Sequence, residues 1–246
     1  MDVQAVSSAV KQRSRKTGQC IYCGSQGPIT DDHVPPRSFY PKNAPKNLIT
    51  VPCCSVCNRE FAKNDDYVRL VLTTTEGAMG NAARDELIPA VKRFAERQES
   101  KRILKSLYES LDSGYYPNAA GVFVRRENFM VEGARVDGFA RRMVKALFYR
   151  EKSHRLPDGY LVNAINHRRM EEIERSSGDN RDFWPFIITE LIERGPRQAW
   201  GDVFAYSWIQ SPNDPNATWW LLEFYGTAQY LCSTWNEAAA AGWPRG

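Results

Sequence analysis

The chain has 246 residues, of which 42% are hydrophobic and 25% charged, with a net charge of +4. This composition excludes a disordered or fibrous protein and is enough to bury a core. The first residues lack the apolar centre of a signal peptide, and no later run approaches the roughly 18 apolar residues of a membrane span. The sequence therefore predicts a cytoplasmic protein without a membrane partner.

A basic N-terminal arm, residues 1–17, is the first feature along the chain. Residues 1–63 hold nine Lys or Arg and four acidic side chains, a net charge of +5, so the remaining residues are close to neutral. A basic segment favours a polyanionic partner, because phosphate contacts release counterions and supply much of the affinity for nucleic acid. For the arm alone, a nucleic-acid-binding segment and a solvated tail are both open interpretations.

A cysteine cluster follows the arm. Two Cys-x-x-Cys pairs, Cys20 with Cys23 and Cys54 with Cys57, each place two thiolates on one tight turn. Two such turns supply the four corners of a tetrahedral zinc site, and disulfides are disfavoured in a reducing compartment. The neighbouring Cys53 is the spare thiol, because only Cys54 has the two-residue spacing to Cys57. Four unpaired structural thiols are the alternative, which the paired spacing disfavours.

The segment between the two cysteine pairs contains "ITDDHVPPRSF". Hydrolysis of a phosphodiester requires an activated water and positive charge near the phosphorane. His33, with an ordinary pKa of about 6.5, can act as the general base. Neighbouring side chains in an extended chain diverge, so Asp32 can hold a metal while His33 faces the water. Asn58, just after the last cysteine, offers an amide oxygen as a second ligand for Mg²⁺ or Mn²⁺. Pro35 and Pro36 stiffen the exit from His33.

The combination of "CIYCG", "DDHVPPRSF" and "NLITVPCCSVCN" resembles the HNH endonuclease family over residues 18–68. The resemblance implies a ββα-metal core with a structural zinc and a separate catalytic divalent ion. It implies that Asn47 is the structural middle residue, which keeps His33 oriented, and that cleavage leaves a 5′-phosphate and a 3′-hydroxyl. The basic residues expected to contact nucleic acid are Arg37, Lys42, Lys46, Arg59 and Lys63.

The rest of the chain alternates helical and strand patterns. Residues 65–112 are expected to be mostly helical, and the cap-like residues Asn64 and Asp65 predict the start of the first helix. As a unit of domain organisation, residues 69–115 are predicted to be a helical connector. The stretch "SGYYPNAAG" is expected to be a loop, "GVFVRRENFMVEG" a strand or hairpin, and "GFARRMVKALFYREK" a helix. Towards the C-terminus, "DVFAYSWI", "TWWLLEFYG" and "AQYLCST" predict antiparallel aromatic strands, in which packing is favoured over base stacking. Cys232 is expected to be a buried thiol.

The predicted fold class is therefore α+β: a zinc-stapled ββα-metal module at 18–68, the helical connector, and a mixed accessory domain at 116–246 with aromatic-rich antiparallel strands. The first functional hypothesis is a metal-dependent endonuclease acting on DNA. The alternative is a non-catalytic zinc module that binds nucleic acid or protein, which has no need of Asp32, His33 and Asn58 together. A third hypothesis makes the nuclease an effector that a protein partner or a ligand controls through the C-terminal region, residues 116–246, by analogy with restriction or antiphage defence.

Overall fold

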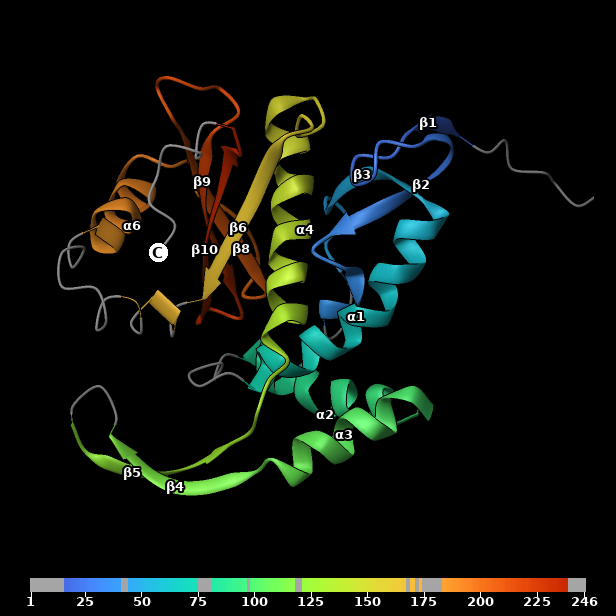
Figure 1. Ribbon diagram of the computed structural model, residues 1–246. Helices are drawn as coiled ribbons and strands as arrows, with labels where there is room; N and C mark the ends of the chain where they lie inside the picture. Colours follow the sequence, from blue (N-terminus) through green and yellow to red (C-terminus); the bar gives the residue numbers. More distant parts are fainter. Residues whose placement is uncertain are drawn as a thin grey trace, which may run out of the picture.

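The structure is a computed structural model of the chain, shown in Figure 1. It describes residues 16–40, 44–74, 81–96, 98–117, 121–166, 169–170, 173 and 183–238. Within this part the protein is α+β, with antiparallel sheets and helices, as the sequence predicts. No helix in the described ranges has the length and apolarity that crossing a membrane requires.

Three short strands followed directly by a long helix make up the N-terminal part: β1 (Thr17–Gln19), β2 (Gln26–Val34), β3 (Ile49–Cys54) and α1 (Ser55–Thr74). β2 is the central strand and pairs with β1 and β3, both antiparallel. Every second residue of β3 is buried, namely Ile49, Val51 and Cys53. This alternation turns one face of the small sheet toward the core.

α1 begins nine residues earlier than the cap-like pair Asn64 and Asp65 predicts. The prediction is wrong because these two side chains lie inside the helix and bind another helix instead of capping their own. Asn64 Nδ2 donates to the backbone carbonyl of Arg135, and the carboxylate of Asp65 pairs with the guanidinium of Arg142. Short polar side chains that cap a helix in one context therefore serve here as tertiary partners.

Two helices follow α1, namely α2 (Asn81–Glu96) and α3 (Gln98–Glu109), in agreement with the predicted helical segment. α1 and α2 are joined by a buried ion pair, in which Arg69 lies 3.3 Å from Glu86 and both side chains are fully buried. Arg69 also donates to the backbone carbonyl of Ser38 at 2.8 Å. These contacts fix the short 3₁₀ helix η1 (Arg37–Phe39), which follows the two prolines, against α1.

A two-stranded hairpin projects from the body of the molecule below the helices (Figure 1). It consists of β4 (Asp112–Pro117) and β5 (Phe123–Asn128), paired antiparallel. The strand prediction for β5 is confirmed, but the prediction of a loop over "SGYYPNAAG" is wrong for the residues of β4. Tyr115 and Tyr116 are strong strand formers, and their cross-strand partners outweigh the local turn signals.

The C-terminal part is a five-stranded antiparallel sheet between two helices. Its strand order is β6-β10-β9-β8-β7. The elements are α4 (Gly133–Lys152), β6 (Tyr160–Asn166), α6 (Phe183–Glu193), β7 (Gln198–Trp200), β8 (Phe204–Gln210), β9 (Thr218–Phe224) and β10 (Ala228–Asn236). In Figure 1 the long helix α4 lies on one face of the sheet and the short helix α6 on the other.

The aromatic strands pack into the core, as the sequence analysis favours. In β9, Trp220, Leu222 and Phe224 belong to the cluster beneath α4, while Leu221 belongs to the cluster beneath α6. This alternation follows the period of two along a strand. Cys232 in β10 is 1% exposed, which confirms the prediction of a buried thiol.

One hydrophobic core connects the N-terminal and C-terminal parts. Phe39 stacks on Phe139 of α4 with ring centroids 5.2 Å apart, and Tyr225 donates its hydroxyl to the Phe39 carbonyl at 2.8 Å. The predicted domain boundaries fall inside elements, at 68/69 within α1 and at 115/116 within β4. The region predicted as a separate accessory domain thus shares its core with the cysteine module.

Candidate metal centre and active site

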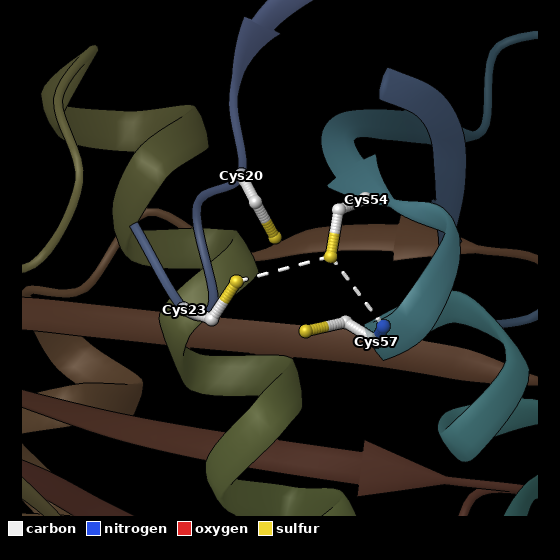
Figure 2. A group of neighbouring side chains, drawn as sticks. All are labelled: Cys20, Cys23, Cys54 and Cys57. Atoms are coloured by element: carbon white, nitrogen blue, oxygen red, sulfur yellow. Dashed lines mark hydrogen bonds between the residues drawn. The ribbon is translucent and has the colours of Figure 1, made fainter. Parts of the chain in front are cut away.

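Four cysteines gather at the junction of β1, β2, β3 and α1 (Figure 2). Cys20 and Cys23 lie in the turn between β1 and β2, Cys54 ends β3, and Cys57 lies in the first turn of α1. Their sulfur atoms all lie within 4.8 Å of one another, and those of Cys23 and Cys54 are 3.8 Å apart. Sulfurs about 2.3 Å from a tetrahedral zinc ion are separated by about 3.8 Å. The group can therefore hold a metal ion such as zinc.

Local backbone geometry brings the thiols together. The turn closes with hydrogen bonds from the Gly24 amide to the Cys20 carbonyl and from the Cys20 amide to the Ser25 carbonyl, both 2.9 Å. Gly24 has φ +75°, in the left-handed region that only glycine adopts freely. On the other side, the start of α1 points the Cys57 amide at the Cys54 sulfur, 3.5 Å away. Amides aimed at sulfur stabilise thiolate ligands.

Cys53 stands apart from the four. Its side chain is fully buried, and its thiol donates to the Cys54 carbonyl at 3.4 Å. Burial raises the pKa of the Cys53 thiol, whereas the hydrogen bonds with Ser25 lower the pKa of Cys23 to about 6. Consecutive strand residues point to opposite faces, which is why the spare thiol faces the core while Cys54 faces the cluster.

His33 and Asp32 lie on opposite faces of β2. In the ladder with β3, His33 pairs with Thr50 and Asp32 with Val51, without a bulge. Asp32 is 8% exposed and accepts a hydrogen bond from the Tyr22 hydroxyl at 2.6 Å. His33 is half-buried, and burial together with the positive charge of Arg37 lowers its pKa below the ordinary value, although Asp31 and Asp32 act in the opposite direction. The imidazole is therefore neutral at pH 7 and can accept a proton.

Asn58 lies on the side of α1 that faces β2. Its Nδ2 donates to the Thr30 hydroxyl at 2.9 Å, and that hydroxyl donates to the Cys53 carbonyl at 3.1 Å. Since the Thr30 hydroxyl donates its only proton to the Cys53 carbonyl, it can only accept a hydrogen bond from Asn58. The amide therefore presents its nitrogen to Thr30, and its oxygen stays available for another partner. Thr30 and Asp32 share one face of β2, about 7 Å apart along the strand. The Asp32 carboxylate and the Asn58 amide therefore lie on the same side of the hairpin.

The segment after His33 is held firmly. Pro35 and Pro36 are both buried, the Phe39 amide donates to the Pro36 carbonyl at 3.0 Å, and the Phe39 ring is fully buried. The double proline thus leads directly into an anchored turn, which fixes the end of β2 that carries His33.

Asn47 occupies the turn before β3, and its side chain is exposed. Its backbone carbonyl accepts a hydrogen bond from the indole of Trp200 at 3.1 Å. With the described residues, its amide side chain makes no hydrogen bond. The orienting role that the resemblance implies stays a prediction, and the backbone is what ties this residue to the sheet.

The basic residues expected at the nucleic acid are exposed where the structure describes them. Arg37 begins η1, Lys46 lies in the turn before β3, and Arg59 and Lys63 are one helical turn apart on α1. Arg59 also donates to the Ser55 carbonyl at 3.2 Å. Lys42 lies outside the described residues.

Two residues near Asp32 were not predicted from the sequence to belong to the site. Tyr22, inside the first cysteine pair, contacts Phe61 of α1 edge to face with ring centroids 4.7 Å apart. Arg142 of α4 lies 4.5 Å over the same Phe61 ring and 2.8 Å from the carboxylate of Asp65. Tyr22 could have been found from its place between two predicted ligands. Arg142 carries no local signal, because only the packing of α4 against α1 brings it to the site.

Comparison with known proteins adds no second line of support. No protein-family model matches the chain, and no curated protein or solved structure matches it either. The resemblance to HNH endonucleases therefore rests on the sequence motifs that carry it.

Proposed function

We propose that this protein is a metal-dependent endonuclease of the HNH type that hydrolyses phosphodiester bonds in DNA. One observation supports this most directly: Asp32 of β2 and Asn58 of α1 lie on the same side of the β2–β3 hairpin, and His33, whose pKa is lowered, is the next residue along β2. A binding module needs no such convergence. The strand–strand–helix order, with the cysteine cluster at its base, is the arrangement that the proposed ββα-metal core requires.

The side chains fit the two metals in different ways. A carboxylate and an amide oxygen suit a hard ion such as Mg²⁺ or Mn²⁺, and Asp32 and Asn58 would hold it. Four thiols at tetrahedral spacing suit zinc. When bound, the divalent ion supplies positive charge to the phosphate undergoing hydrolysis. Bound to the cysteines, zinc would tie the β1–β2 turn and the end of β3 to the start of α1, the elements that carry Asp32 and Asn58.

Side chains of the protein accept the proton and bind the substrate. His33 accepts the proton of the attacking water, since its lowered pKa keeps it neutral at pH 7. Arg37 lies close enough to His33 to influence that pKa, and its exposed guanidinium can bind a phosphate oxygen of the same strand. Arg59 and Lys63 extend the positive surface along α1.

The test is cleavage of supercoiled plasmid with Mg²⁺ or Mn²⁺ by the wild type and by His33→Ala. The matched control is His154→Ala, which removes an exposed histidine that follows α4. Zinc content is measured in all three proteins. We expect nicked or linear products from the wild type and the control, and a loss of at least about 100-fold for His33→Ala. Equal cleavage by His33→Ala would refute the assignment of the base. Binding without cleavage by the wild type would favour the interaction module or a partner-controlled enzyme.

A further inference from the structure

Asp32 is connected through Tyr22 and the ring of Phe61 to Arg142 of α4. The Tyr22 hydroxyl donates to Asp32 Oδ2 at 2.6 Å, a length typical of a hydrogen bond to a carboxylate. A phenol hydroxyl at this distance from a carboxylate oxygen is the donor, and the carboxylate is the acceptor. No other hydrogen bond from the described residues engages Asp32. Tyr22 thus holds one carboxylate oxygen and leaves the other for a ligand.

Tyr22 is itself held from two sides. It lies between Cys20 and Cys23, so any metal at the cysteines fixes the backbone that carries its ring. Its ring packs against Phe61 of α1 at an interplanar angle of 78°. A phenol so placed has little freedom to move away from Asp32.

Arg142 of α4 lies at the other end of this series of contacts. Arg142 is 6% exposed, covers the Phe61 ring and pairs with Asp65. The Nη2 atom of Arg142 is buried and has no hydrogen-bond partner in the described part of the structure. Asp65 thus pairs with Arg142, while Asp32 is held by the Tyr22 hydroxyl.

We propose that Tyr22 is a positioning residue, through which the cysteine metal centre and helix α4 together orient the Asp32 carboxylate toward the catalytic ion. This inference rests on the proposed function, because it assigns Asp32 to that ion. It makes the C-terminal region a structural part of the nuclease site rather than a separate attachment, since Arg142 of α4 packs on the Phe61 ring that holds Tyr22. Residues that orient a metal ligand in this way typically change metal affinity by about 10- to 100-fold when removed.

The test is Tyr22→Phe, which deletes the hydroxyl and keeps the ring against Phe61. Tyr115→Phe is the matched control, because it makes the same change on the exposed hairpin. Mn²⁺ affinity is measured on the zinc-loaded full chain by electron paramagnetic resonance, together with zinc content, thermal stability and the Mn²⁺ dependence of plasmid cleavage. Asp32→Asn serves as the reference for loss of the ligand itself.

We expect Tyr22→Phe to retain zinc and to weaken Mn²⁺ binding about 10-fold, while its cleavage at saturating Mn²⁺ returns to within about threefold of the wild type. Tyr115→Phe should match the wild type in every measurement. If Asp32→Asn weakens Mn²⁺ binding but Tyr22→Phe does not, the positioning role is refuted and the proposed function stands. If Asp32→Asn leaves Mn²⁺ binding unchanged, Asp32 is not a ligand, and the proposed function fails together with this inference.

Discussion

The carboxylate of Asp65 and the guanidinium of Arg142 form a buried ion pair, 2.8 Å apart, between α1 and α4. Burial raises the pKa of Asp65 to about 6, while the charge of Arg142 lowers it. At neutral pH the pair is therefore ionised. It joins the helix that presents Asn58 to the helix that supports the C-terminal sheet.

Arg142→Met should destabilise the protein by about 3–5 kcal/mol, because it leaves the Asp65 charge buried without a partner. Urea unfolding measures this loss. Arg125→Met is the matched control, since Arg125 pairs with Glu127 on the exposed hairpin. Exposed pairs contribute about 1 kcal/mol or less. The double variant Asp65→Leu/Arg142→Met should recover most of the stability. Equal losses for Arg142→Met and Arg125→Met would show that the buried pair has no structural role.

The sequence predicts features that depend on local patterns, but not those that depend on contacts between distant segments. The four cysteines were identifiable because each pair is local and its spacing alone defines a turn. The aromatic strands were identifiable from their composition. The prediction that Asn64 and Asp65 cap a helix is wrong because their partners, Arg135 and Arg142, lie far away in the chain. Tertiary packing decides the role of such residues, and periodicity within one segment does not contain it.

Cys54→Ser should lose most of its zinc, whereas Cys53→Ser should retain it. Both changes replace sulfur by oxygen at adjacent positions, but only Cys54 belongs to the four-sulfur cluster. Metal analysis of the purified proteins measures the difference. Because metal binding is coupled to folding, Cys54→Ser should also lower the melting temperature by on the order of 10 °C.

Cys53→Ser is expected to lower the stability of the protein without affecting zinc, so stability and zinc content must be compared separately. A hydroxyl in a buried apolar site costs about 1–3 kcal/mol, so this variant should be less stable than the wild type although its zinc is intact. Zinc loss from Cys53→Ser with retention in Cys54→Ser would reverse the assignment of the ligand.

The acid limb of the cleavage rate should report the pKa of His33. Burial and Arg37 lower this pKa below 6.5, and the base acts only when neutral. Activity should therefore persist at pH 6.5 and fall as the pH drops through the lowered value. Arg37→Gln removes a positive charge that disfavours the imidazolium, so it should raise the pKa and move the acid limb to higher pH.

The pH profile of kcat/KM, with NMR titration of His33 as an independent readout, measures this shift. Lys46→Gln is a suitable control, because it removes an exposed charge that is not among the causes of the His33 shift. A shift of the limb to lower pH in Arg37→Gln would contradict the proposed electrostatic coupling.

Thr30→Val should weaken the divalent metal site, although Thr30 is not a ligand. Its hydroxyl accepts the hydrogen bond of Asn58 Nδ2 and donates to the Cys53 carbonyl, which is what fixes the orientation of the amide. Valine has nearly the same shape but cannot accept that bond, so the amide is free to rotate its oxygen away from the ion. We expect an approximately 10-fold rise in the Mn²⁺ concentration needed for half-maximal cleavage. Thr30→Ser keeps the hydroxyl and should stay close to the wild type. If valine and serine behave alike, the strand contributes shape alone, and Asn58 is oriented by its place on α1.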